Sequence, residues 1–178
     1  MDAKFRQLIE LSAGEFEHVN GLLIAHLEGT RCLLKAWNAS KVLQDAGLYH
    51  AAYGRPAFAQ NIFELSKRED VAVVIGNDVE NIVYHYCACD REAFFAQFGL
   101  VGTPVFYNHI TSKKSAVSFE MLQNLCELIA ANETEIAINN SNYVALHGAE
   151  LVDLFRRMQT FLSSNAQRKI HHVFASHF

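Results

Sequence analysis

The chain has 178 residues, of which 51% are hydrophobic and 19% are charged, and its formal net charge is −4. This length and apolar content suit one domain with a sizeable core, and the small acidic excess gives no support for nucleic-acid binding. No apolar run approaches the roughly 20 residues of a membrane-spanning helix, so we expect no membrane association.

Hydrophobic spacing predicts helices in the N-terminal third of the chain. A short helix is expected over residues 2–12 and a second over residues 15–36, because apolar residues recur there at helical spacing. Gly29 could bend the second helix, since glycine weakens a helix interior. Ser40 is a suitable N-cap for a third helix over residues 41–52.

Glycine and proline mark the expected end of the third helix. Gly54 can adopt the left-handed cap conformation, and Pro56 cannot continue a helix. The apolar run at 71–75 is strand-like by propensity. That run is short and a helical pattern resumes after it, so we expect mostly helix over residues 70–88. A further short helix should begin at Asp90.

The second half continues the helical pattern after one irregular region. Residues 99–115 should form a long loop, or a small hairpin around 103–110, because they hold two glycines, a proline and a Ser/Lys cluster. Ser118 should cap a long helix that runs to about residue 136. A loop is expected over residues 139–142. A final helical region should then span residues 146–175, with a break near residues 163–165.

The chain shows no internal repeat or low-complexity linker, so we expect one compact, all-α domain over residues 1–178. Its low charge and high apolar content leave room for a homodimer. It begins without a basic-plus-apolar leader, and its four cysteines show no C-x-x-C spacing. We therefore expect a cytoplasmic protein with reduced thiols that are small core residues and not nucleophiles.

His26 and His50 form the most informative pair in the sequence. Each lies on an expected helix, and the apolar stretch between them could fold the two helices back to back. Two neutral imidazoles brought together in this way can hold a metal ion. The alternative is that both are buried, hydrogen-bonded core residues. His18, two turns before His26, is a weaker third imidazole candidate.

Four segments resemble the motifs of a family of uncharacterised, HD-like bacterial domains. That family carries the patterns H-L-x-G-T, A-G-L-x-H-x-x-Y-G, I-G-x-x-x-E and A-N-x-x-E. The matching segments here are His26–Thr30, Ala46–Gly54, Ile75–Glu80 and Ala131–Glu135. The resemblance covers most of the chain. It implies an HD-like helical bundle related to the HD-type metal-dependent phosphohydrolases.

The resemblance also implies which residues would hold a metal. In the HD superfamily, a histidine on one helix is followed by a helix that ends in a His-Asp pair, and a later helix supplies an aspartate. By resemblance, His26 and His50 match the two histidines. Ala51 stands where the first aspartate is expected, and Asn132 stands near the later one. Such a site keeps both imidazoles. At position 132 an amide replaces the later carboxylate, and at position 51 the first carboxylate is missing.

The donor set decides which metal is expected. Hard cations such as Mn²⁺ and Mg²⁺ prefer carboxylate oxygens, so two imidazoles and an amide would bind them weakly. Adding Glu135 or Glu80 gives a set that suits Zn²⁺ or Fe²⁺. Asn132 and Glu135 are three residues apart on one helix and share a face. We expect a divalent metal (Zn²⁺, Fe²⁺ or Mn²⁺) bound by His26, His50, Asn132 and Glu135.

Glu80 and Tyr53 are the catalytic candidates. Glu80 lies in an apolar helical segment, where a carboxylate is either on the solvated face or held in a polar pocket. A buried carboxylate without a partner would suit general acid–base catalysis. Tyr53 is either a core ring with a satisfied hydroxyl or a proton donor at the mouth of a pocket.

These residues lead to three functional hypotheses. The first is a metal-dependent, hydrolase-type enzyme that acts on a small polar or phosphorylated substrate through a metal-bound water. The alternative is a catalytically degenerate HD-like fold that binds a small molecule or a partner protein, because Ala51 removes an anionic ligand. A further alternative follows from the resemblance, since the HD superfamily also contains non-haem iron oxygenases.

Overall fold

Side-chain caps determine where several helices begin. In this computed structural model, which describes residue 6 and residues 21–54 and 62–178, Ser40 accepts a hydrogen bond from the backbone N–H of Leu43 at 3.1 Å. Such a cap satisfies an N–H group that has no partner inside the helix. The side chains that cap later helices in the same way are Asp90, Ser118, Asn140 and Ser163.

The α-helices in chain order are α2 (Gly21–Ala36), α3 (Lys41–Tyr49), α4 (Arg68–Ile75), α5 (Asn77–Ala88), α6 (Arg91–Phe95), α7 (Phe119–Asn139), α8 (Ser141–Arg157) and α9 (Ser164–Val173). Single 3-10 turns are η2 (Leu65–Lys67), η3 (Gln159–Phe161) and η4 (Ala175–His177). The strands β1 (Phe106–Asn108) and β2 (Lys113–Ser115) pair antiparallel, with Tyr107 opposite Lys114.

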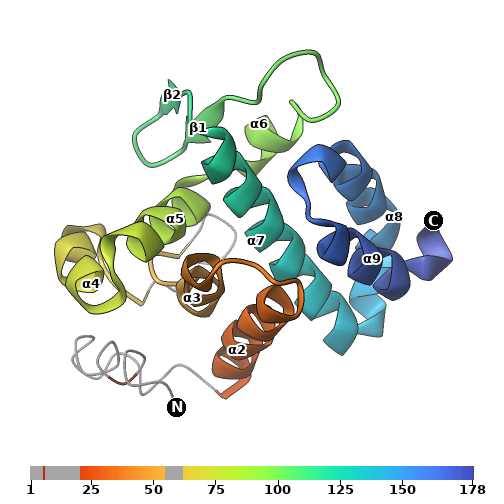
Figure 1. Ribbon diagram of the computed structural model, residues 1–178, viewed down its shortest axis with the longest axis horizontal. Helices are drawn as coiled ribbons and strands as arrows, with labels where there is room; N and C mark the ends of the chain where they lie inside the picture. Colours follow the sequence, from red (N-terminus) through yellow and green to blue (C-terminus); the bar gives the residue numbers. More distant parts are fainter. Residues whose placement is uncertain (1–5, 7–20, 55–61) are drawn as a thin grey trace.

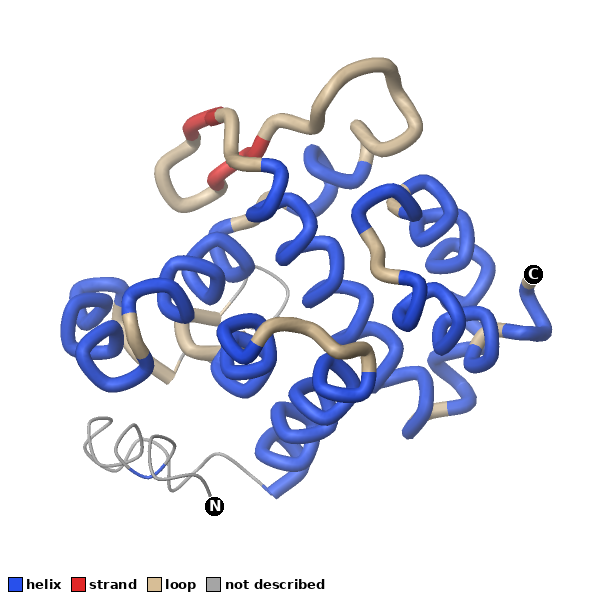
Figure 2. Tube along the Cα trace, in the orientation of Figure 1, coloured by secondary structure: helices blue, strands red, loops and turns tan. Residues whose placement is uncertain are grey.

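Helix α7 runs through the centre of the described fold, and the other long helices pack around it (Figure 1). It contacts α2, α3 and α5, and it also contacts α8 and α9. Helix α3 packs against both α2 and α5. Figure 2 shows that helix dominates the described part of the chain, with the small hairpin at one end. The expectation of a compact, mostly α-helical fold is confirmed.

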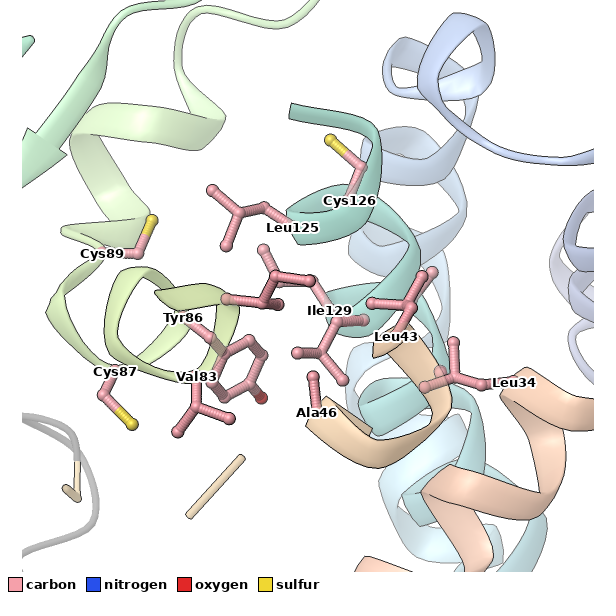
Figure 3. Packing of buried hydrophobic residues seen from close by; sticks show 14 of the residues in the cluster. Leu34, Leu43, Ala46, Val83, Tyr86, Cys87, Cys89, Leu125, Cys126 and Ile129 are labelled. Atoms are coloured by element: carbon pink, nitrogen blue, oxygen red, sulfur yellow. The ribbon is translucent and has the colours of Figure 1, made fainter. Parts of the chain in front are cut away.

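The core between α3, α5 and α7 is built from apolar side chains at helical spacing. Leu43 and Ala46 of α3, Val83 and Tyr86 of α5, and Ile129 of α7 gather there (Figure 3). None of these five is more than 4% exposed. Burying such side chains is the main favourable contribution to folding. Because α2, α3 and α7 are packed together, His26, His50 and Asn132 lie in the same part of the fold.

Three helix boundaries differ from the predictions. Helix α3 ends at Tyr49, before residue 52, because the chain already turns after its C-cap residue His50. Gly76, with φ of 96°, divides the predicted helix over 70–88 into α4 and α5. Helix α8 begins five residues before position 146, because Asn140 caps the N–H of Tyr143 at 3.1 Å and restarts the helix at once.

Other expectations were met in part. Helix α2 is continuous through Gly29, and Gly54 has the left-handed φ of 66° that was expected. The hairpin lies later than 103–110, because its turn is made around Ser112, which has φ of 55°. Cys32 is exposed, contrary to expectation, whereas the other three cysteines are buried, and all four are free thiols.

Some predictions fall on residues outside the described part of the chain. These are the helix over 2–12, the start of the helix over 15–36, the candidate ligand His18, and Pro56. Within the described residues, no helix combines the length and the apolar character needed to cross a lipid bilayer.

Candidate functional site

A glycine allows α2 and α7 to approach closely beside His26. A Cβ atom at Gly29 would lie 2.8 Å from Oε1 and 2.9 Å from Cγ of Glu135. Any side chain at position 29 would therefore collide with the Glu135 side chain. With glycine there, Glu135 of α7 extends across α2 and reaches the ring of His26, one turn earlier on α2.

His26 makes contacts through both ring nitrogens. Its Nδ1 forms a short ion-pair contact with Oε2 of Glu135, and its Nε2 lies 3.1 Å from Oδ1 of Asn132. The other Glu135 oxygen, Oε1, accepts a hydrogen bond from Asn139 at 2.7 Å. The two nitrogens of an imidazole point away from each other. Asn132 and Glu135 thus hold opposite edges of the same ring.

The orientation of the Asn132 amide follows from its second hydrogen bond. Its Nδ2 donates to Oε1 of Glu133 at 3.1 Å, so Oδ1 is the amide atom that faces His26. A carbonyl oxygen only accepts, and Nε2 of His26 must therefore donate in this contact. An ionised Glu135 only accepts, so Nδ1 is the donor in its contact with Oε2.

Glu133 is itself held by two further groups. Arg91 Nη1 lies 3.3 Å from its Oε1, and the Tyr143 hydroxyl donates a short hydrogen bond to Oε2. Burial lowers the pKa of Arg91, but the neighbouring Tyr86 and Glu133 raise it by more, so Arg91 stays charged. Glu133, which holds the Asn132 amide, is consequently held in place by side chains from both α6 and α8.

His50, the C-cap residue of α3, completes the cluster. It is 5% exposed, and its ring centroid lies 5.2 Å from that of His26, with the two planes at 83°. Its Nδ1 donates to the carbonyl oxygen of Gly47 at 2.7 Å. In the neutral ring, the lone pair is then on Nε2. The ring of Tyr86 packs edge-on against the other side, at 5.2 Å.

The four predicted metal ligands are therefore neighbours, because His26 contacts each of the other three. Two imidazole nitrogens and an amide oxygen form a donor set that fits Zn²⁺ or Fe²⁺ better than Mg²⁺ or Mn²⁺. Among the described residues, no group of three or more His, Cys, Asp and Glu side chains is arranged to hold a metal ion. Any site here depends on the Asn132 amide.

The predicted catalytic pair lies in a separate buried ion pair. Glu80, 5% exposed, accepts hydrogen bonds from Tyr53 at 2.9 Å and from Arg68 Nε and Nη2 at 2.6 and 2.8 Å. Burial, then the charge of Glu80, raises the pKa of Tyr53 far above its usual range. Within the described chain, no hydrogen bond links Glu80 or Tyr53 to His26. This arrangement favours a structural role for both residues.

The buried thiols are poor nucleophiles. Burial raises the pKa of Cys89 to about 12 and raises that of Cys126 further. Cys87 donates a hydrogen bond to the backbone carbonyl of His50 at 3.2 Å. Because the thiolate is the reactive form, these residues behave as small core side chains.

Sequence reasoning missed the residues that orient the site. The spacing of Glu135 and Asn139, four apart on one helix, could have indicated their contact. Nothing comparable indicates that Arg91 and Tyr143 meet Glu133, since those contacts join different helices.

Comparison with models of protein families gives a match to the first half of the chain. The model of a family described as a domain of unknown function (DUF6817) matches residues 7–91, slightly less than half of the chain. That segment includes His26 and His50 but not Asn132 or Glu135. No curated protein and no solved structure matches the chain.

Proposed function

We propose that this protein is a metal-dependent, hydrolase-type enzyme of HD-like fold that acts on a small polar or phosphorylated substrate. His26, His50 and Asn132 would hold the ion. Glu135 would orient His26 and would not bind the ion itself, because both of its oxygens already contact His26 and Asn139. Four free cysteines suit a reducing compartment, and we therefore also propose a cytoplasmic location.

The observation that carries the proposal is the hydrogen bonding of the two imidazoles. Metal-binding histidines commonly donate their second N–H to a carboxylate or a backbone carbonyl, which fixes the tautomer and the orientation of the ring. Here Nδ1 of His26 meets the Glu135 carboxylate, and Nδ1 of His50 meets the Gly47 carbonyl. Both rings therefore have the outer partner that this role requires.

The spacing of His26 and Asn132 supports the same assignment. Two atoms that bind one zinc ion at about 2.1 Å lie about 3–3.5 Å apart. His26 Nε2 and Asn132 Oδ1 are separated by 3.1 Å. Binding requires Nε2 to lose its proton while Glu135 keeps its hydrogen bond to Nδ1, so metal affinity should rise with pH. A bound Zn²⁺ or Fe²⁺ supplies Lewis acidity and an activated water.

Metal analysis after purification without chelator tests the proposal. We expect about one Zn²⁺ or Fe²⁺ per chain, with most of it lost in His26→Ala and His50→Ala. His172→Ala is the matched control, because it removes an exposed histidine on α9 that could bind metal adventitiously. A metal content far below one per chain, equal in all four proteins, would reject the site.

A catalytic assay tests the second half of the proposal. Phosphate release from a panel of small phosphorylated compounds should depend on added Zn²⁺ or Fe²⁺ and should disappear in His50→Ala. Activity that survives this substitution would assign hydrolysis to another site or to a contaminant.

The second candidate is a metal-free binding module with a degenerate site. It is favoured by Ala51, which places an apolar residue and not a carboxylate directly after His50 in the sequence, and by the internal partners of both His26 nitrogens. Titration with Zn²⁺ while the melting temperature is measured separates the two candidates. An ion at about 100 times its Kd adds roughly 2.7 kcal/mol to the stability. A rise of the melting temperature that His50→Ala abolishes would exclude the metal-free module.

A further inference from the structure

A pocket lies between α8, η3 and α9, away from the histidine cluster. It has a volume of about 320 Å³. Ligand pockets range from about 300 to 1,000 Å³, so this one suits a small molecule and not a folded partner. Phe155, Leu162 and Ile170 line it, and each is almost completely buried, so its floor is apolar.

The ionisable side chains of this pocket are all basic. Arg156, Arg168 and His171 line it, and no Asp or Glu is among its lining residues in the described chain. The Arg156 side chain makes neither a hydrogen bond nor an ion pair with any described residue, so its guanidinium donors remain available. Arg168 uses Nη2 to contact Asn165, which leaves its other N–H groups. Guanidinium groups bind carboxylates through paired, charge-assisted hydrogen bonds.

An aromatic ring already occupies the edge of the pocket. The ring of Phe178 lies 4.5 Å from that of His171, and the Arg156 guanidinium carbon lies 5.1 Å from the Phe178 centroid. Phe178 is 45% exposed. The basic groups therefore accommodate an aromatic group beside them, as expected for guanidinium and imidazole groups against ring faces.

We propose that this pocket binds a small amphipathic anion, namely a carboxylate on an aromatic or short alkyl body. The carboxylate would meet Arg156 and Arg168, and the apolar body would contact the floor formed by Phe155, Leu162 and Ile170. An anion without an apolar body would lose the floor contacts, and a neutral molecule of the same shape would lose the charge-assisted hydrogen bonds. The site is independent of the proposed metal site, because the two share no residue.

Calorimetric titration of the full chain with 3-phenylpropionate tests this proposal. The matched probes are 3-phenylpropan-1-ol, which removes the charge, and acetate, which removes the apolar body. We expect 3-phenylpropionate to bind at least about tenfold more tightly than the alcohol, since hydrogen bonds to charged groups are worth at least that factor. We expect the same minimum factor over acetate, because acetate has no apolar body to bury against the floor.

Two arginine variants locate the binding. Arg156→Gln and Arg168→Gln should each reduce the affinity for the carboxylate toward that of the alcohol and leave alcohol binding unchanged. Both residues are exposed, so both variants should fold. Lys35→Gln is the matched control, because it removes an equal charge from an exposed position on α2.

Three results would overturn the proposal. The first is equal affinity for the acid and the alcohol. The second is an equal loss of affinity in Lys35→Gln and in the two arginine variants, which would indicate nonspecific attraction. The third is no binding of 3-phenylpropionate at about 10 mM, well above the millimolar range of weak specific ligands.

Discussion

Replacing Glu133 with glutamine should release the Asn132 amide from its observed orientation. The carboxylate accepts hydrogen bonds from Asn132 at 3.1 Å, from Arg91 at 3.3 Å and from the Tyr143 hydroxyl. A glutamine has one oxygen and one NH₂ group, so it can face the Asn132 amide with either a donor or an acceptor. Both orientations of that amide then become accessible, and Oδ1 no longer has to face His26.

The expected magnitude follows from these contacts. A hydrogen bond to a charged group contributes about 1.5–3 kcal/mol, so the bond to Glu133 favours the observed orientation by about 10- to 100-fold. The variant should reduce this preference to a few-fold. It should also lower the free energy of unfolding by about 2 kcal/mol, because Arg91 loses its charged partner. For a chain of this size, that corresponds to a decrease in melting temperature of about 4–8 °C.

Nitrogen NMR of the histidine rings measures the orientation directly. In the native protein freed of metal, Nε2 of His26 should be protonated, because it donates to Asn132 Oδ1. In Glu133→Gln, a population should appear in which Asn132 Nδ2 donates and Nε2 carries the lone pair. Glu150→Gln is the control, since it makes the same chemical change at an exposed position on α8. It should leave both the ring signal and the melting temperature unchanged.

One outcome would refute this reasoning. If Nε2 of His26 is protonated to the same extent in Glu133→Gln as in the native protein, Glu133 does not control the amide. A lower melting temperature with an unchanged ring signal would assign Glu133 a purely structural role. Neither result requires a bound metal, so both are independent of the proposed function.

Gly29→Ala should displace Glu135 from His26 and destabilise the fold by about 1–3 kcal/mol through overpacking. The higher helix propensity of alanine should offset about 1 kcal/mol of this cost. In thermal melts, the effects of Gly29→Ala and Glu135→Ala on stability should be non-additive in the double variant. Iodoacetamide should modify Cys32 quickly in the folded protein and the three buried cysteines only after unfolding, as mass spectrometry would show. Arg68→Ala should cost about 3 kcal/mol in urea unfolding, because Glu80 stays buried without its cation; a cost near zero would contradict a structural ion pair.

The helical fold could be predicted because its signals are local. Ser40 and Ser118 were identified as N-caps from residue type and position alone, and both accept the expected backbone hydrogen bonds. The exact position of the hairpin and the early start of α8 were harder to predict from the sequence. Whether Asn140 ends one helix or starts the next depends on where the chain turns, and that is decided by packing between helices.

The candidate site was predictable in its members but not in its connections. The resemblance to family motifs indicated His26 and Asn132, and the three-residue spacing from Asn132 added Glu135. His26 is more than 100 residues from either of them in sequence. The sequence could not show which nitrogen of His26 meets which partner. It also could not show that Glu80 is hydrogen-bonded to Arg68. A buried carboxylate with a partner and a buried carboxylate without one have the same appearance in the sequence.

The amide at position 132 also bears on the substrate of the proposed enzyme. An aspartate presents an oxygen in either orientation, whereas an asparagine must be held so that its oxygen and not its nitrogen faces the site, as Glu133 does here. Because an amide and two neutral imidazoles supply no negative charge, an ion bound by His26, His50 and Asn132 would keep a charge of about +2 among its direct ligands. Such a site would favour an anionic ligand, and that charge balance makes phosphorylated compounds the first substrates to assay.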